Sequence, residues 1–108
     1  MARPFFAYML LCADQSYYVG HTDELEHRLS QHEKGTGSIY TSTRLPVCLV
    51  WSEEFPTRDE ALAAELRIKK WSRAKKEALI AGDFSALRLA AKKTDWAGYR
   101  RRRNQPGR

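Results

Sequence analysis

The sequence predicts a small α/β domain of the α+β type, with a central three-stranded antiparallel sheet flanked by helices. Two apolar, β-compatible runs lie near residues 5–12 and 47–54, and two capped helical patterns occupy the stretch between residues 57 and 82. The composition, 43% hydrophobic and 11% aromatic, is typical of a globular protein. A chain of 108 residues has length for one domain.

The expected sheet begins with a β-hairpin. The run FFAYMLLC at 5–12 is followed by the turn residues ADQS, and an extended pattern resumes from Tyr17 to Val19. The segment GTGSIYTSTR at 35–44 has no apolar period and is expected to be a loop. The run VCLVW after Pro46 predicts a third strand at about 47–54.

The first expected helix follows the hairpin and covers about 23–34. Thr22 or Asp23 can cap its start, and Gly35 can end it. The helix carries Glu24 in its first turn, which suits the positive end of the helix dipole.

Two further helices are predicted in the second half of the chain. Thr57 and Glu60 form a capping box before a long helical pattern, and Ser72 can cap a shorter helix that ends before Gly82. One more helix could form over 86–91. We expect a single domain over 1–93.

The net charge of +6 is unevenly distributed. Five positive charges come from Arg100 to Arg103 and Arg108, whereas the first 99 residues hold 14 basic and 13 acidic residues. Residues 94–108 are therefore expected to form a basic, flexible tail. Such a tail either binds the phosphate backbone of a nucleic acid without sequence specificity or is a solvated end of the chain, and both interpretations stay open.

A second group of basic residues lies between Arg67 and Lys76, where one predicted helix ends and the next begins, with no acidic residue among them. It consists of Arg67, Lys69, Lys70, Arg73, Lys75 and Lys76. The group is either a solvated helix face or a surface that holds a phosphate backbone.

Cys12 and Cys48 lie in apolar runs and have no Cys or His neighbour at zinc-site spacing, so buried free thiols are expected. The chain shows no secretory leader and no apolar run of about 18 residues. We therefore expect a cytoplasmic protein with no membrane partner.

Several polar side chains stand where packing favours apolar ones. Tyr8 lies inside the apolar first strand, and antiparallel pairing with the second strand could bring it near Tyr18. Gly20 on that second strand allows another group to approach the backbone closely. Arg28 and His32 are four residues apart and so share a helix face. Taken singly, the tyrosine fits a core and the Arg/His pair fits an exposed polar flank.

Glu65 is the most informative single residue of the long helical pattern. At about 100° per residue it falls in the arc occupied by Ala61, Leu62, Ala64 and Ile68. It could pair with Lys69 one turn away, or it could point into a site and hold a cation.

Together these residues reproduce the pattern Y-x-G-x-T-x(5)-R-x(3)-H from Tyr18 to His32, with Tyr8 ten residues upstream. The chain resembles the GIY-YIG nuclease domain over about residues 5–82. The segment from Ala61 to Ile80 is similar to the second half of small stand-alone bacterial members, which are relatives of the nuclease module in excision repair. The chain departs from the pattern at Ala7, where the family has glycine. The late family asparagine has no clear counterpart, since Asn104 lies in the tail.

The resemblance implies the GIY-YIG fold and a DNA endonuclease that hydrolyses one phosphodiester bond with one Mg²⁺ (or Mn²⁺) on Glu65. Arg28 would clamp the phosphate, and Tyr8 would deprotonate or orient water, its pKa lowered by Arg28 and the metal. Tyr18 and His32 would complete the network. The sugar-phosphate backbone of the DNA would be held by Gly20, Lys69, Lys70, Arg73, Lys75 and Lys76. His21 and His27 fall off the pattern and are expected at the surface.

Two other functions stay open. The chain could be a weakly active or non-catalytic nucleic-acid-binding module of the same fold, or a structural protein whose arginine tail docks on an acidic partner. DNA repair, or processing of single-stranded or branched DNA, is the expected setting. No small-molecule cofactor is expected, and a protein partner could supply targeting. The sequence does not indicate an oligomeric state.

Overall fold

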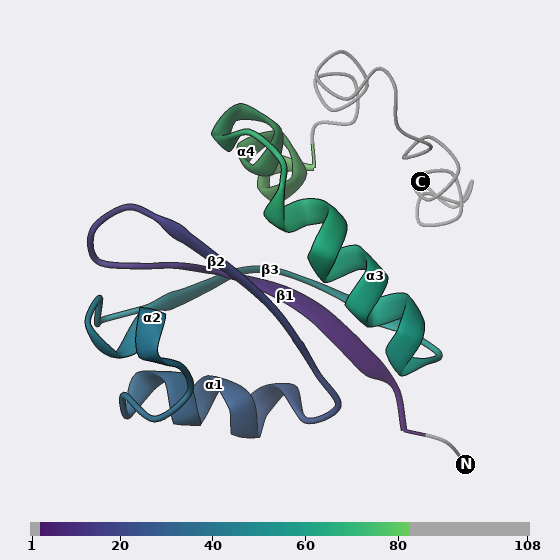
Figure 1. The fold of residues 1–108 in the computed structure, drawn as a ribbon, viewed down its shortest axis with the longest axis horizontal. Coiled ribbons are helices and arrows are strands. Elements are labelled where there is room, and N and C mark those ends of the chain that lie inside the picture. The colour runs from purple at the N-terminus through teal and green to yellow at the C-terminus, as the bar shows by residue number, and fades with distance from the viewer. Residues whose placement is uncertain (1–2, 83–108) are drawn as a thin grey trace. The chain divides into compact units, whose positions relative to one another are not determined.

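The computed structural model describes residues 3–82, which form a three-stranded sheet and four helices (Figure 1). In chain order the elements are β1 (Phe5–Leu11), β2 (Tyr17–Thr22), α1 (Leu25–Glu33), α2 (Ile39–Ser42), β3 (Cys48–Phe55), α3 (Arg58–Lys69) and α4 (Arg73–Ala81). The expected helix over 86–91 and the expected tail over 94–108 lie outside the described residues. The predicted α+β class with three antiparallel strands is confirmed.

β1 is the central strand of the sheet, with the order β2-β1-β3 and antiparallel pairing on both sides. The register pairs Tyr8 with Gly20 and Leu10 with Tyr18. Because side chains alternate between faces and directly paired residues share one, Tyr8, Tyr18 and Gly20 lie on the same face. His21, which is paired with Ala7, lies on the opposite face.

The helices of residues 3–70 cover both faces of this sheet. α1 and α2 lie on one side and α3 crosses the other (Figure 1). α3 begins where the capping box predicted, because the Thr57 hydroxyl accepts a hydrogen bond from the Glu60 N–H at 3.2 Å. Its inward face buries Ala61, Ala64, Ile68 and the Glu65 side chain. The long helix therefore brings a carboxylate against the sheet.

α4 belongs to a second unit of the chain, from residue 71 onward. The Ser72 hydroxyl accepts from the Lys75 N–H at 3.2 Å, and Gly82 closes the helix with a φ of +72°, as the sequence predicted. None of the helices in the described range is long and apolar enough to cross a bilayer.

Three local expectations are wrong. The segment 35–44 is not wholly a loop, because it contains α2, whose Ser38 hydroxyl caps the Thr41 N–H. α1 begins only at Leu25 and has no side-chain cap, since the Thr22 hydroxyl instead accepts from the Glu24 N–H before the helix. Cys12 is a buried free thiol as expected, but Cys48, at the start of edge strand β3, is exposed.

Candidate active site

A buried chain of hydrogen bonds joins β1 to α1 and α2. The Tyr8 hydroxyl lies 2.8 Å from His32 Nε2, and His32 Nδ1 lies 2.8 Å from the Thr41 hydroxyl. All three residues are 0% exposed. If Nδ1 carries the proton, it donates to Thr41, Thr41 donates to the Ser38 carbonyl, and Nε2 accepts from Tyr8. Each hydrogen-bond donor in this series of four residues then has an acceptor.

Burial controls the protonation of this pair. It raises the pKa of the Tyr8 hydroxyl from 10.0 to about 12, although the Arg28 guanidinium beside it acts in the opposite direction. The expected lowering of the pKa of Tyr8 is therefore not observed in the protein alone, because loss of solvation outweighs the arginine. Burial, followed by the charge of Arg28, lowers the pKa of His32. At neutral pH the pair consists of a phenol and a neutral imidazole.

Two glycines allow these side chains to lie so close to the backbone. A Cβ at position 20 would stand 2.7 Å from the Tyr8 hydroxyl oxygen. A Cβ at position 37 would stand 2.5 Å from His32 Nδ1 and 2.9 Å from its Cα. Gly20 therefore serves the packing of Tyr8, which gives this motif position a concrete physical role.

Tyr18 and Arg28 complete this side of the site. The Tyr18 ring lies 6.4 Å from the Tyr8 ring and 5.1 Å from the His32 ring, measured between centroids. Arg28 donates a hydrogen bond from Nη1 to the Gln31 side chain at 3.0 Å and is half-buried. The structure thus brings together Tyr8, Tyr18, Arg28 and His32, as their spacing predicted.

Glu65 approaches from α3, on the opposite side of the sheet. Its carboxylate is 11% exposed and has one oxygen 2.6 Å from His21 Nδ1 and the other 2.7 Å from Lys69 Nζ. It therefore makes the predicted ion pair and also points inward. The carboxylate raises the pKa of Lys69 and contributes to the raised pKa of Tyr8, so it acts electrostatically on the tyrosine.

The donor set fits a metal ion only in one way. Within residues 3–82 no group of three or more His, Cys, Asp or Glu side chains is arranged to hold a cation. A site supplied by protein alone is therefore not available there. Glu65 fits an ion of the Mg²⁺ type, which takes one or two carboxylates and completes its shell with water and substrate phosphate. The second donor beside it is His21.

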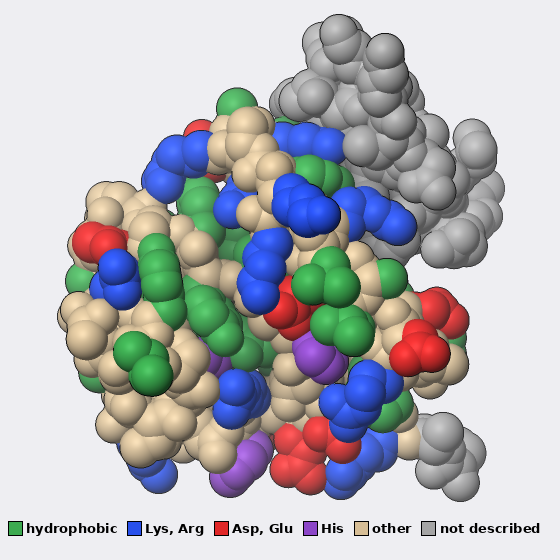
Figure 2. All heavy atoms as spheres, viewed as in Figure 1, with side chains coloured by type: hydrophobic (Ala, Val, Ile, Leu, Met, Phe, Trp, Pro, Cys, Tyr) green, Lys and Arg blue, Asp and Glu red, His purple; other side chains and the backbone are tan. Residues whose placement is uncertain are grey.

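The basic residues around the end of α3 differ in their surroundings. Lys69 pairs with Glu65, and Lys70 is exposed. Within the second unit Arg73 pairs with Glu77 at 2.9 Å, Lys76 is half-buried, and Lys75 differs from the expected surface cation because it is buried with Nζ 4.0 Å from the centroid of the Trp71 ring. On the face in Figure 2, basic side chains stand next to acidic and histidine ones. This face is not uniformly basic.

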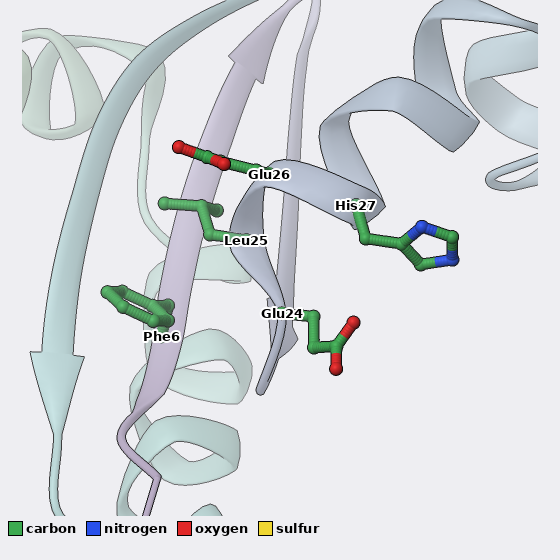
Figure 3. A pocket seen from close by; sticks show the side chains of 5 residues that line it. All are labelled: Phe6, Glu24, Leu25, Glu26 and His27. Atoms are coloured by element: carbon green, nitrogen blue, oxygen red, sulfur yellow. The ribbon is translucent and has the colours of Figure 1, made fainter.

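A separate shallow depression lies between β1 and the start of α1, lined by Phe6, Glu24, Leu25, Glu26 and His27. The Phe6 and Leu25 side chains lie on the same side, and His27 points away from them (Figure 3). His27 is exposed, as expected. The depression contains none of the predicted site residues.

Two residues that contact the site were not predicted from the sequence. His21 was expected at the surface, yet it is 22% exposed and paired with Glu65. Its position next to Gly20 in an alternating strand could have indicated that it faces α3. Thr41 lies in a segment expected to be a loop, and the only signal was its dense run of hydroxyl residues.

Comparison with known proteins agrees with this geometry. Residues 4–78 match the family model of the GIY-YIG catalytic domain. A UPF0213 protein of Natronomonas pharaonis is 43% identical over 83 residues, which cover 77% of this chain and 98% of that protein. The UPF0213 protein YazA of Bacillus subtilis is 44% identical over 75 residues, covering 69% and 76% of the two chains.

A solved structure is similar as well. A solution NMR structure of a protein from E. faecalis, 41% identical, covers 75% of this chain and 86% of that chain with a TM-score of 0.53. The family match spans the strands and helices that carry Tyr8, Arg28, His32 and Glu65. The chain therefore belongs to the GIY-YIG domain family, and small UPF0213 proteins are among the relatives to which it is similar in sequence.

Proposed function

We propose that this protein is a metal-dependent endonuclease that hydrolyses a phosphodiester bond of DNA at a single site. The observation that carries the proposal is the buried pair of Tyr8 and His32 beside the half-buried Arg28. A buried phenol and imidazole in hydrogen-bond contact, next to a guanidinium, form an acid–base group beside an anion-binding group.

Arg28 binds the scissile phosphate. A guanidinium offers a planar fork of donors that matches two phosphate oxygens, and it stays charged at any working pH. It also stabilises the negative charge that builds on those oxygens in the transition state. Its hydrogen bond to Gln31 orients the half-buried guanidinium, which lies beside Tyr8.

Tyr8 and His32 activate the attacking water together. A phenol whose pKa is about 12 is almost entirely protonated at neutral pH, and a protonated phenol is a poor base by itself. The water gives its proton to the Tyr8 oxygen while the Tyr8 proton passes to His32 Nε2, which produces a neutral tyrosine and an imidazolium. The resulting hydroxide forms a bond to phosphorus, the bond between phosphorus and the 3′ oxygen breaks, and the departing 3′ oxygen takes a proton from solvent. Thr41 keeps Nε2 free to accept by fixing the proton on Nδ1.

Glu65 would hold one Mg²⁺ or Mn²⁺, with His21 as its neighbour. When bound, such an ion supplies charge neutralisation for the phosphate and the leaving oxygen. Lys69 occupies the second carboxylate oxygen and keeps the side chain oriented toward the sheet. Lys70 is exposed at the end of α3, where it can contact the flanking backbone without reading bases.

The test is a cleavage assay on labelled single-stranded, branched and duplex DNA with Mg²⁺. Glu65→Gln is expected to lower the rate by at least about 10²-fold, the effect typical of removing one group that stabilises transition-state charge. Glu77→Gln is the matched control, because Glu77 also pairs one turn along its helix but is 51% exposed. Equal rates for wild type and Glu65→Gln would overturn the proposal. Binding without cleavage of any substrate would show a binding module instead.

A further inference from the structure

An exposed aromatic and apolar patch lies on α2, next to the hydrogen-bond chain. Ile39 is 87% exposed and Tyr40 is 38% exposed. The Tyr40 ring lies 6.0 Å from the Tyr18 ring, which in turn contacts the His32 ring at 5.1 Å. The patch is therefore continuous with the proposed active site, although the proposed mechanism uses neither residue.

The Tyr40 ring is held in place by its neighbours. The Arg44 guanidinium carbon lies 3.8 Å from its centroid, and Arg44 Nη1 donates to the Tyr40 carbonyl at 2.9 Å. Asp14 fixes the other end of the guanidinium, accepting from Nε at 2.9 Å. The adjacent residue, Thr41, is buried in the hydrogen-bond chain. A ring fixed in this way loses little further entropy when a ligand binds it.

The chemistry of the patch selects one class of ligand. An aromatic ring and a guanidinium plane in contact are the surfaces on which unstacked nucleobases are bound. The charge of Arg44 is already paired with Asp14, so the patch offers flat aromatic and apolar surface more than net charge. Together with a phosphate-binding arginine on the neighbouring helix, this surface fits the base of a nucleotide.

We propose that Ile39, Tyr40 and Arg44 form a base-stacking site for an unstacked nucleobase adjacent to the scissile phosphate. The inference rests on the proposed nuclease function and specifies its substrate. A base in a continuous duplex has both faces covered by its neighbours, so binding at this site requires an unpaired or displaced nucleotide. The patch thus favours strands with unpaired positions.

The test is equilibrium binding of the full chain to oligonucleotides in EDTA, where no cleavage occurs. The probes are a single strand of DNA containing 2-aminopurine, the matching RNA strand and the full duplex. Tyr40→Ala is expected to weaken binding of the single strand by between about five- and a hundred-fold and to remove the change in 2-aminopurine fluorescence. Tyr40→Phe keeps the ring and is expected to bind like wild type.

Two further variants separate stacking from a general loss of structure. Ile39→Ala changes a side chain that is almost wholly exposed, and it is expected to weaken binding in the same direction without changing the unfolding temperature. Leu49→Ala, at a residue 38% exposed on β3, is the matched control and is expected to bind like wild type. The ratio between wild type and Tyr40→Ala is expected to persist as salt is raised, because stacking releases no counterions.

The outcomes distinguish the two proposals. A wild type that binds and cleaves, with Tyr40→Ala equal to it in affinity and fluorescence change, overturns the base-stacking site and leaves the nuclease proposal standing. Patch variants that change self-association but not oligonucleotide binding also overturn it, and show an interface between copies instead. A wild type that neither binds nor cleaves any oligonucleotide overturns the nuclease proposal itself, and this inference with it.

Discussion

Gly20→Ala is expected to damage the candidate active site by displacing Tyr8. The added Cβ would stand 2.7 Å from the Tyr8 hydroxyl oxygen and 2.8 Å from Cζ, so the ring must move by roughly 0.7 Å to restore an ordinary contact. Tyr8 is 0% exposed, and its hydroxyl is 2.8 Å from His32. A shift of this size lengthens that hydrogen bond beyond its useful range.

The expected magnitudes follow from this displacement. Overpacking a buried site costs about 1–3 kcal/mol, and each kcal/mol lowers Tm by about 4–8 °C in a domain of this size. Misplacing a reacting group by a fraction of an ångström to an ångström lowers the cleavage rate by up to about 10²-fold. Thermal unfolding and single-turnover cleavage of labelled DNA measure the two effects separately.

Gly82→Ala is the control for Gly20→Ala. Gly82 has a φ of +72° and nothing within 4 Å of an added Cβ, so alanine there is strained without touching the site. It is expected to cost about 1–2 kcal/mol and leave the cleavage rate unchanged when measured below both unfolding temperatures. If Gly20→Ala cleaves as fast as Gly82→Ala, the role given to the position of Tyr8 is refuted. If Gly20→Ala keeps the wild-type Tm, the packing argument fails.

Four further outcomes are expected. Arg28→Lys keeps the charge but loses the planar fork, so cleavage should fall at least about tenfold; a wild-type rate would contradict the proposed clamp. Lys69→Met should change the free energy of unfolding by less than about 0.5 kcal/mol, because Lys69 itself is half-exposed. The same variant should lower the Mg²⁺ concentration for half-maximal cleavage, and an unchanged midpoint would argue against Glu65 as the ligand. Thr57→Ala removes the α3 cap and should lower the free energy of unfolding in urea by about 1 kcal/mol with no effect on cleavage. Burial lowers the pKa of His32 in the folded state, so the unfolded chain binds a proton at this residue more readily. The free energy of unfolding should therefore fall as pH decreases from about 6.5 to the lower folded pKa, and level off below it. Urea unfolding of His32→Gln should show no such pH dependence.

The fold was largely predictable because its local signals agree with the tertiary packing. Thr57 and Ser72 cap the helices that they were expected to cap, and Gly82 ends α4 in the left-handed conformation. α2 was missed because its four residues have no apolar period, and a serine cap and a buried threonine hydroxyl stabilise it. Such a helix depends on contacts with α1 that single-sequence patterns do not contain.

The proximity of the candidate site residues was predictable from the sequence, whereas their electrostatics were not. Spacing indicated Tyr8, Arg28, His32 and Glu65, and the first three do meet on one face of the sheet. Spacing says nothing of desolvation, so it did not indicate that burial raises the pKa of Tyr8 in the protein alone. The predicted lowering by Arg28 together with a bound metal ion stays a prediction. The contact between His21 and Glu65 joins residues 44 positions apart and depends on how α3 crosses β2.

β2 carries Gly20 and His21 to opposite faces of the sheet, one beside Tyr8 and the other beside Glu65. Two adjacent residues therefore contact two chemically different parts of the candidate site, the tyrosine side and the carboxylate side. A substitution at position 21 changes the surroundings of the carboxylate and leaves the tyrosine packing untouched, whereas position 20 acts only on the tyrosine side. Under the proposed function, the carboxylate side and the tyrosine side can therefore be altered by separate single substitutions, without loss of the hydrogen bond between Tyr8 and His32.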